Sequence, residues 1–447
     1  MDDLASLSTE AFLRFNRRLP RYTSYPTAPF FEEFSPANYR NILSSLNGPV
    51  SLYIHIPFCR KMCLFCACSV VLNRSQERQE AYVQTLLDEI RLVASFLSEE
   101  VTIREVHFGG GTPTNLTEEQ FVEIFTTLKT HFLWEKEVEC SIEIDPRTVF
   151  EQHSLPFLRG YFSRISLGIQ DLRENVQRAV KRIQSQELIA DVMRQARTLR
   201  FASVNFDLIY GLPLQTPESL EKTAYEVATK YAPERIALFS YAKLPELKPH
   251  QKAIRDQDLP TTQEKGEMYL RTRTTFLNQG YRAIGMDHFA LPQDSLSIAY
   301  KENRLYRNFQ GYGIKKAPHM LGLGVTSIGF FSGKGYVQNT KDLSLWQAKI
   351  GRGELPVALG KWHSEDDQKR YRVIQEIMCR FSYVFSSQEA LYFAKEIARL
   401  QEMPELVTFE GTGFTVTPLG RLFVRNIASV FDAYLRASAS TRYSHSL

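Results

Sequence analysis

Short runs of β-branched and aromatic residues alternate with segments of helical periodicity up to about residue 243. Between the first two runs, apolar side chains recur at helical spacing from Tyr82 to Leu97, with charged residues on the opposite face. The six runs, which we interpret as strands, cover residues 51–58, 103–110, 137–145, 164–170, 203–211 and 235–243. Strands that alternate with helices pair in parallel, because each parallel neighbour needs a crossover connection. The pattern therefore predicts an open or closed α/β barrel of six strand–helix units.

Two connections carry specific signals for the start of a helix. Thr117 followed by Gln120 forms a capping box in front of an apolar face. Thr216 is a candidate N-cap, with Pro217 at the first helical position. Both signals follow directly after a predicted strand, as the alternating pattern requires.

After residue 290 the alternation stops, and the pattern predicts a mainly helical segment. Helical periodicity covers residues 364–381 and 388–403, and a hairpin over residues 406–416 turns at Gly411 to Gly413. Thr417 and Pro418 begin a last amphipathic helix that we expect to end near Tyr434. This order of elements resembles a winged-helix module. We therefore predict three parts: an N-terminal arm (1–43), a barrel core (44–290) and a C-terminal cover domain (291–447).

Composition and charge exclude several classes of protein. The chain has 447 residues, of which 43% are hydrophobic, so it can bury a sizeable core. A net charge of +4 is too small to indicate a nucleic-acid binder. The acidic first residues lack the features of a secretory signal, and no apolar run is long enough to span a membrane. We expect a cytoplasmic protein that binds neither nucleic acid nor membrane, in a compartment where thiols stay reduced.

Four of the six cysteines lie within ten positions, at Cys59, Cys63, Cys66 and Cys68. Dense thiols in a reducing compartment indicate a metal or an iron–sulfur cluster rather than disulfides. The first three fit a short loop around three corners of a four-iron cluster, which leaves one iron open for a substrate or cofactor. Two alternatives stay open at this point. Cys68 is a possible fourth ligand, which would close the cluster, and a zinc site is possible from spacing alone.

Polar residues and glycines follow the predicted strands at or just beyond their ends. In α/β barrels the carboxyl ends of the strands carry the chemistry, so these positions are candidates for a common site. The residues concerned are Gly109 to Thr112, Glu143, Asp145, Gln170, Asp207 and Ala242. A single polar residue at a strand end means little, but a recurrence at successive strands favours an active site.

The stretch "HIPFCRKMCLFC" resembles the signature of the radical S-adenosylmethionine (radical SAM) superfamily. The longer "YIHIPFCRKMCLFCAC" is similar to the version in oxygen-independent coproporphyrinogen III oxidases. The likeness continues through "PRYTSYPTA", "GGGTPT", "SIEIDPR", "DLIYGLP", "GMDHFA", "RNFQGY" and "TPLGRLFVRNI", from residue 20 almost to the end. Ala67 and Ser69 depart from the glycine and asparagine that are common in the family, at the rim of the cysteine loop.

The resemblance implies a partial (βα)6 radical SAM barrel and a set of cofactor contacts. Cys59, Cys63 and Cys66 would hold a 4Fe-4S cluster, with S-adenosylmethionine on the open iron. Cleavage of this cofactor would give a 5′-deoxyadenosyl radical. Tyr53, Gly110 and Glu143 correspond to contacts of the cluster-bound cofactor, and Ile328 to a cofactor contact from beyond the barrel. Contacts of a second S-adenosylmethionine correspond to Phe65, Gly111, Thr112, Gln170, Arg182, Asp207 and Ala242.

The residues alone would give some of these positions a different interpretation. Without the resemblance, Phe65, Ala242 and Ile328 are typical of core packing, and Arg182 of an exposed charge on a helix. Glu143 would be a solvated strand end. The resemblance implies that Cys68 is a residue typical of the oxidases and that it is not a ligand of the cluster. We assign it a catalytic role.

The implied substrate is coproporphyrinogen III, a macrocycle with four propionates. The reaction would convert two propionates to vinyl groups and give protoporphyrinogen IX in haem biosynthesis. Arg21 is our candidate for binding one propionate, because a guanidinium donates two aligned hydrogen bonds to a carboxylate. We expect an electron donor such as a flavodoxin or ferredoxin, and a monomer.

Two other functions are weighed against the oxidase. A haem-binding chaperone of the same superfamily would keep the cysteine loop, but such proteins generally lack the fourth cysteine and the "RYTSYPT" arm, which this chain has. A non-enzymatic metal-binding interaction protein would leave the strand-end residues unexplained.

Overall fold

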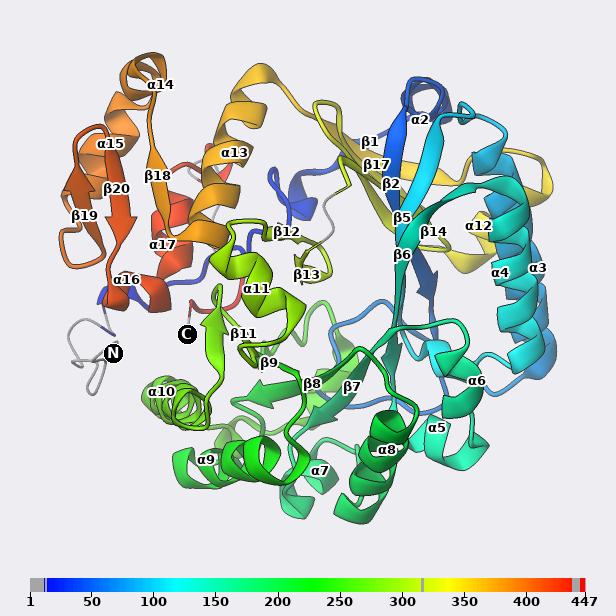
Figure 1. Ribbon diagram of the computed structural model, residues 1–447, viewed down its shortest axis with the longest axis horizontal. Coiled ribbons are helices and arrows are strands. Elements are labelled where there is room, and N and C mark those ends of the chain that lie inside the picture. Colours follow the sequence, from blue (N-terminus) through cyan, green and yellow to red (C-terminus); the bar gives the residue numbers. More distant parts are fainter. Residues whose placement is uncertain (1–11, 13, 315–316, 436–442, 447) are drawn as a thin grey trace.

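A parallel sheet forms the centre of the molecule, as the alternating pattern predicts. The computed structural model describes residues 12, 14–314, 317–435 and 443–446. Its main sheet has 13 strands, and six of them run in parallel in chain order. These six curve into an open barrel (Figure 1). They are β2 (Gly48–Ile56), β5 (Val101–Gly110), β6 (Leu133–Ile144), β7 (Arg164–Gln170), β8 (Ser203–Tyr210) and β9 (Arg235–Ser240).

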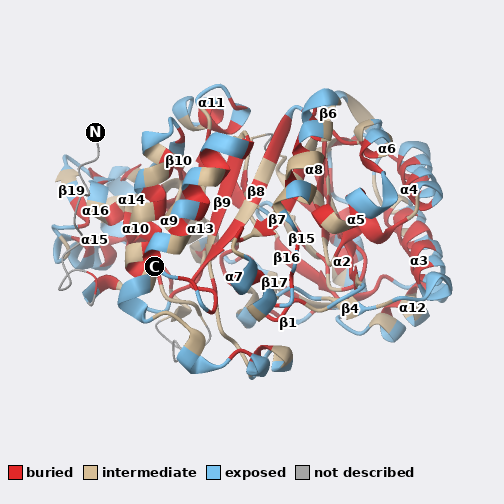
Figure 2. Ribbon diagram, turned by 90° about the horizontal axis from the view of Figure 1, so that it is seen from below, coloured by how far each residue is buried: buried red, intermediate tan, exposed pale blue. Residues whose placement is uncertain are grey.

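Helices cover the outer face of this barrel, and they carry most of the exposed residues there, whereas the strands behind them are largely buried (Figure 2). The predicted capping box at Thr117 and Gln120 is confirmed, and so is the N-cap at Thr216. The covering helices are α3 (Gln76–Ala94), α4 (Glu118–His131), α5 (Pro146–Gln152), α6 (Leu155–Arg159), α7 (Glu174–Ala179), α8 (Gln186–Thr198), α9 (Pro217–Glu226) and α10 (Thr262–Asn278).

The expectation of a mainly helical segment after residue 290 is wrong for residues 319–362. Strand β14 (His319–Leu323) pairs in parallel with β2. Strands β15 (Ile328–Phe331), β16 (Gly335–Asn339) and β17 (Val357–Trp362) then extend the sheet, each antiparallel to the strand before it. These strands are short and rich in glycine, so the sequence carries little strand signal, and pairing with the barrel edge stabilises them instead. The division at residues 43 and 290 stays a prediction.

The far edge of the sheet is completed by two short strands. Strand β11 (His288–Ala290) pairs antiparallel with β9, and β10 (Arg282–Ile284) pairs with β11. The remaining elements before the C-terminal lobe are α11 (Ser295–Lys301), the hairpin of β12 (Tyr306–Asn308) and β13 (Gly311–Gly313), and α12 (Leu343–Gly351).

A buried carboxylate fastens the added strands to the barrel. Glu89 on α3 is 1% exposed and accepts hydrogen bonds from the Gly324 N–H (2.7 Å), the Asn339 side-chain amide (2.6 Å) and the Trp346 indole N–H (3.2 Å). Burial raises its pKa to about 7, although the three donors oppose this shift. The turn that follows β14 is therefore held against α3, and this turn leads directly into Ile328.

The N-terminal arm is packed rather than extended into solvent. It includes β1 (Glu32–Glu33), which pairs with β17, and α2 (Pro36–Leu43). Tyr22 and Tyr25 are at most 1% exposed, and the Tyr22 hydroxyl donates to Asp432 at 3.1 Å. The Arg425 Nε–H donates to the Pro20 carbonyl at 2.9 Å. The arm thus joins the barrel to the C-terminal lobe.

The C-terminal lobe, drawn in orange and red in Figure 1, has the predicted winged-helix order. The hairpin is confirmed, but the last helix is wrong in extent: it breaks at Phe423 and ends at Ser429, not near Tyr434. Phe423 is fully buried, with its backbone outside the helical region, so packing overrides the amphipathic pattern there. The elements are α13 (Glu365–Arg380), β18 (Ser382–Val384), α14 (Ser387–Tyr392), α15 (Ala394–Gln401), β19 (Val407–Glu410), β20 (Gly413–Val416), α16 (Pro418–Leu422) and α17 (Val424–Ser429).

Candidate active site and cofactor site

The four clustered cysteines lie on one loop at the carboxyl end of β2. Cys59 ends β3 (Phe58–Cys59), which pairs in parallel with β4 (Val71–Leu72), and the loop between these strands carries the other three. The Cys66 N–H donates to the Cys63 carbonyl at 3.2 Å, which forms a tight turn between two of the thiols. Cys63 is buried and Cys68 is exposed. A compact loop therefore presents its thiols from within a short span, and the Cys68 thiol contacts that of Cys66.

The loop that follows β9 binds the backbone of the cysteine loop. Fully buried Gln251 donates to the carbonyls of Phe65 (2.9 Å) and Ala242 (3.3 Å). His250 and Lys248 donate to the carbonyls of Cys66 and Cys68 at 2.8 and 2.7 Å. Nothing in the sequence pattern marks residues 248–251 as functional, and the sequence analysis missed them. These contacts hold two of the predicted cofactor residues, Phe65 and Ala242, next to each other.

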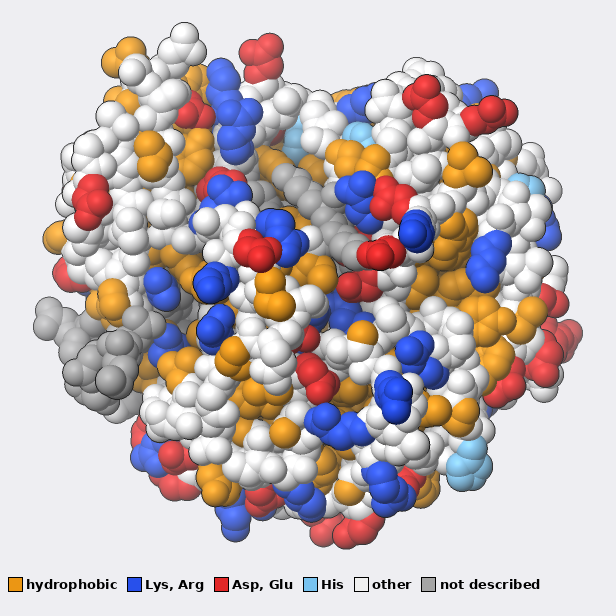
Figure 3. Space-filling model, viewed as in Figure 1, with side chains coloured by type: hydrophobic (Ala, Val, Ile, Leu, Met, Phe, Trp, Pro, Cys, Tyr) orange, Lys and Arg blue, Asp and Glu red, His pale blue; other side chains and the backbone are white. Residues whose placement is uncertain are grey.

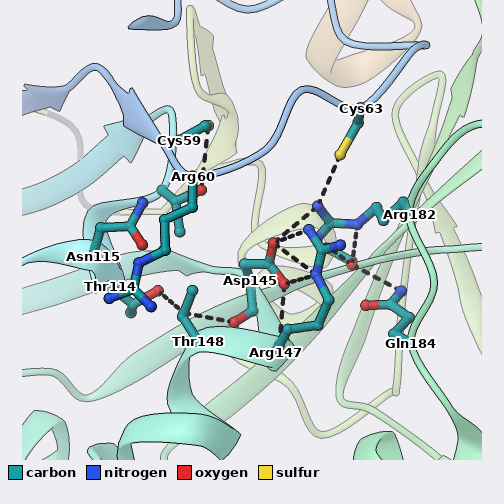
Figure 4. A network of polar contacts seen from close by, with 12 residues as sticks. Cys59, Arg60, Cys63, Thr114, Asn115, Asp145, Arg147, Thr148, Arg182 and Gln184 are labelled. Carbon is teal, nitrogen blue, oxygen red and sulfur yellow. Dashed lines mark hydrogen bonds and ion pairs between the residues drawn. The ribbon is translucent and has the colours of Figure 1, made fainter. Parts of the chain in front are cut away.

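A charged network lies below the cysteine loop (Figure 4). Arg182 points its guanidinium at Cys63 Sγ (3.5 Å) and at the Asp145 carboxylate (3.2 Å), and it also donates to the Gly168 carbonyl (2.8 Å). Burial opposes ionisation of Asp145, but Arg182 and Arg147 outweigh it and lower its pKa to about 2. The expectation of an exposed Arg182 is wrong: it is 9% exposed, because it lies in the turn after α7 and faces the barrel.

The three thiols fit a cluster better than a single metal ion. Among the described residues, no group of three or more His, Cys, Asp or Glu side chains is close enough to hold one ion. Thiolates that bind different irons of a four-iron cluster lie further apart than thiolates that bind one ion, so a loop of spaced thiols suits a cluster. Thiolate ligands are also soft donors, and the buried Arg182 cation beside Cys63 favours their negative charge. Burial raises the pKa of Cys59 to about 11, so ligation there releases a proton.

Two glycines at the end of β5 allow the backbone to approach the loop closely. Gly110 has φ +116°, and a Cβ there would lie 2.6 Å from the His55 ring. A Cβ on Gly111 would lie 2.6 Å from the Pro57 carbonyl oxygen. The next residue, Thr112, has its hydroxyl 3.4 Å from Cys59 Sγ. The "GGGT" stretch therefore contacts both the cysteine loop and the barrel rim, and its assignment to S-adenosylmethionine stays a prediction.

The wall of the barrel next to this rim is acidic. Glu143 on β6 accepts from the Gly110 N–H at 3.1 Å and lies 3.6 Å from His107 Nε2. Asp207 on β8 accepts from Ser166 (2.9 Å) and Asn205 (2.8 Å). Burial, with the nearby charge of Glu143, raises the pKa of Asp207 to about 7. Both carboxylates face one cavity of about 140 Å³ inside the barrel, which we call the barrel cavity.

The remaining predicted residues lie around the same rim, with one exception. Tyr53 on β2 hydrogen-bonds to His55 (2.9 Å), and Gln170 ends β7 with φ +68°. Ile328 on β15 lies beside Gly322, which pairs with Tyr53. Arg21 is the exception: it forms an ion pair with Asp287 and stacks on the Phe239 ring at 5.2 Å. Its assignment to a propionate stays a prediction.

Comparison with known proteins decides the family. The model of the radical SAM superfamily matches residues 53–226. The oxygen-independent coproporphyrinogen III oxidase of Salmonella typhimurium is 40% identical over 95% of this chain and 95% of its own length. That of Pseudomonas aeruginosa is 39% identical over 99% of both. The chain belongs to the oxygen-independent coproporphyrinogen III oxidase family.

The fold of these oxidases is present along almost the whole chain. The solved structure of the coproporphyrinogen III oxidase of Escherichia coli, described as a radical SAM enzyme, matches with a TM-score of 0.87 and 37% identity. The match covers 94% of this chain and 100% of that one. The α/β radical SAM fold predicted from the sequence is thus confirmed, and so is membership in the oxidase family.

The charged side chains on one face of the molecule are mixed in sign. On the face shown in Figure 3, positive and negative side chains are interspersed rather than gathered into one field. None of the helices that the structure describes is both long and apolar enough to cross a membrane.

Replacing Gln251 by Leu tests whether the hydrogen bonds of this side chain hold the cysteine loop in place. Leu retains most of the side-chain volume but leaves two carbonyls, and the Leu244 N–H that donates to Gln251, without this partner. Each such loss costs about 1–3 kcal/mol, so we expect a lower melting temperature and less iron per chain after anaerobic reconstitution. Gln76→Leu, on the exposed start of α3, is the matched control. If Gln251→Leu kept the iron content and the melting temperature of the wild type, Gln251 would not be what holds the cysteine loop.

Asp207→Asn tests the cost of the buried carboxylate. The Asp207 carboxyl group keeps its proton up to about pH 7 in the folded chain, whereas in the unfolded chain it loses the proton near pH 4. The free energy of unfolding therefore falls as the pH rises between these two values. We expect Asp207→Asn to melt at a higher temperature than the wild type at pH 8, with a smaller difference at pH 5. Exposed Asp88→Asn is the control. An Asn variant that is less stable at both pH values would refute this explanation.

Proposed function

We propose that this chain converts coproporphyrinogen III to protoporphyrinogen IX without oxygen, by oxidative decarboxylation of two propionates. The observation that carries the proposal is the loop of three spaced thiols beside an acidic barrel cavity, in a chain that is 40% identical to such an oxidase. The glycine rim and the buried Arg182 beside Cys63 support the same conclusion. These features have no purpose in a protein that merely binds a metal.

We assign the ligand and cofactor contacts as follows. Cys59, Cys63 and Cys66 would hold the 4Fe-4S cluster, and two S-adenosylmethionine molecules would bind along the rim. When bound, these groups supply a 5′-deoxyadenosyl radical that takes a hydrogen atom from the β-carbon of a propionate. Contacts to the first cofactor come from Tyr53, Gly110, Glu143 and, we propose, Ile328, and those to the second from Phe65, Gly111, Thr112, Gln170, Arg182, Asp207 and Ala242.

The residues of this chain position the reactants and exclude water. The backbone carbonyls of the glycines at the end of β5 are not shielded by side chains, so they can accept hydrogen bonds from the ammonium group of S-adenosylmethionine. The Glu143 carboxylate can accept hydrogen bonds from hydroxyl or amino groups of the same cofactor. After losing its β-hydrogen, a propionate side chain releases carbon dioxide and one electron and becomes a vinyl group. The electron must leave through an acceptor, and a reductant must supply the cluster. We propose a flavodoxin or ferredoxin as the reductant, a monomeric enzyme and a cytoplasmic location.

A reconstitution experiment tests this function. The protein is loaded with iron and sulfide without oxygen, then given reductant, S-adenosylmethionine and coproporphyrinogen III. We expect both 5′-deoxyadenosine and protoporphyrinogen, and neither from Cys63→Ser, which removes a cluster ligand. Cofactor cleavage without porphyrin product would refute the oxidase but not the radical chemistry. Bound haem without turnover would indicate a chaperone.

Cys68→Ser separates a catalytic role from ligation. Because Cys68 is the exposed member of the loop, we expect the variant to bind as much iron as the wild type while losing at least about tenfold in protoporphyrinogen formation. Cys140→Ala, which removes a buried thiol on β6, is the control for loss of a cysteine elsewhere. Loss of iron in Cys68→Ser would show that Cys68 is a ligand instead.

A further inference from the structure

A second and larger cavity lies between the C-terminal lobe and the barrel. It has a volume of about 450 Å³, against about 140 Å³ for the barrel cavity. Its walls come from α13, from strands β14 and β15 and from residues 303–308. We call it the lobe cavity. Its size falls in the range of pockets that hold small organic ligands, whereas the barrel cavity is too small for a tetrapyrrole.

The two cavities adjoin. Ser51, Tyr306 and Asn308 line both of them. The Tyr306 hydroxyl donates to Glu105 on the barrel wall at 2.5 Å, so its ring lies at the boundary. A ligand in the lobe cavity would therefore lie next to the space in which Glu143 and Asp207 face each other.

The cavities carry opposite charge. The barrel cavity is lined by four carboxylates, Glu105, Glu139, Glu143 and Asp207, and by two arginines. Of these arginines, Arg164 forms an ion pair with Glu139 (3.1 Å) and Arg235 with Asp294 (2.7 Å). Among the described residues, the lobe cavity is lined by one acidic residue, Glu376, and by four arginines: Arg304, Arg307, Arg372 and Arg380. Each of these arginines also has a carboxylate neighbour, which is Glu302, Asp287, Glu389 and Glu376, respectively, but only Glu376 lines the cavity itself. Carboxylates are repelled by the first set of groups and attracted by the second.

Two residues that line the lobe cavity each have a buried side-chain nitrogen without a hydrogen-bond partner among the described residues. These nitrogens have almost no accessible surface, so a ligand in the cavity reaches them only if neighbouring side chains move. They are Arg307 Nη1 and His363 Nε2, on side chains whose residues are 3% and 8% exposed. Unsatisfied buried polar groups are costly, so they indicate a missing partner. The Arg307 guanidinium is otherwise fixed, because its Nε–H donates to the Arg21 carbonyl at 3.3 Å and its plane stacks on Tyr312 at 4.5 Å.

Aromatic side chains surround the His363 ring. Its centroid lies 5.7 Å from that of Tyr371 and 6.0 Å from that of Phe330, and both of these residues line the cavity. Pyrrole rings pack well against such faces. The lobe cavity therefore combines apolar walls, an excess of arginines and unpaired polar atoms.

We propose that the lobe cavity binds the macrocycle of a tetrapyrrole polycarboxylate, with Arg307 and Arg372 as carboxylate receptors and His363 as a further polar contact. This inference rests on the proposed function, and it identifies where that substrate sits. One propionate then points past Tyr306 and Asn308 toward the barrel cavity, while other propionates stay among the arginines. Arg21 and Arg307 both lie beside Asp287, and this proposal places the propionate receptor at Arg307 rather than at Arg21.

The test measures binding and turnover separately on the cluster-loaded enzyme. Binding is followed with coproporphyrin III, the stable oxidised form of the substrate, by its fluorescence. Arg372→Glu changes an exposed side chain on α13, and His363→Phe keeps the ring packing but removes Nε2. We expect Arg372→Glu to raise the Kd for coproporphyrin III and the KM for coproporphyrinogen III about tenfold, and His363→Phe about threefold. Formation of 5′-deoxyadenosine without substrate stays at the wild-type level.

Arg399→Glu on α15 is the matched control, because it makes the same charge change on the exposed surface of the same lobe. Wild-type binding by Arg372→Glu and His363→Phe would overturn the proposal, and so would equal weakening by Arg399→Glu. If the wild-type enzyme bound coproporphyrin III but made no protoporphyrinogen, the proposed function would fail while the binding site would stand. If turnover were normal in every variant with unchanged KM, only the site would fail.

Discussion

The parallel pairing of six strands in chain order is the constraint on which the rest of the structure depends. Parallel strands end at the same edge of their sheet, so residues that are far apart in the sequence meet there. The cysteine loop follows the first of these strands, and Glu143 and Asp207 lie on the third and fifth. A slip of one residue in any pairing would turn these side chains away from the barrel cavity. The chemistry of the site thus depends on strand register.

Charge is distributed around this scaffold in a way that serves two different ligands. Acidic groups line the barrel cavity, where amino and hydroxyl groups of a cofactor would find acceptors. Burial, and after it the nearby charge of Glu143, raises the pKa of Asp207. Arginines line the lobe cavity, where propionates would find donors under the proposed binding mode. The cation of Arg182 lies between the barrel and the thiols, beside Cys63. Separation of the two charge fields would keep a polycarboxylate substrate out of the cofactor space.

Local patterns predicted the barrel strands, the helix caps and the hairpin well, because each depends on neighbours in the sequence. Strands β14 to β17 were missed, since pairing with β2 rather than their own composition holds them. The resemblance identified the cysteines and the rim residues, but spacing alone could not show that Arg182 is buried. Gln251 and Arg307 carried no signal at all. Their roles come from contacts with residues more than 180 and 280 positions away, respectively.

The central claim is that three cysteines hold a cluster whose fourth iron accepts S-adenosylmethionine. Electron–nuclear double resonance on the reduced, reconstituted protein tests it directly, with the cofactor isotopically labelled at its amino nitrogen. The account predicts a hyperfine coupling between that nitrogen and the cluster, unchanged in Cys68→Ser. Absence of the coupling, with a Mössbauer spectrum of four thiolate-bound irons or with zinc in place of iron, would contradict it.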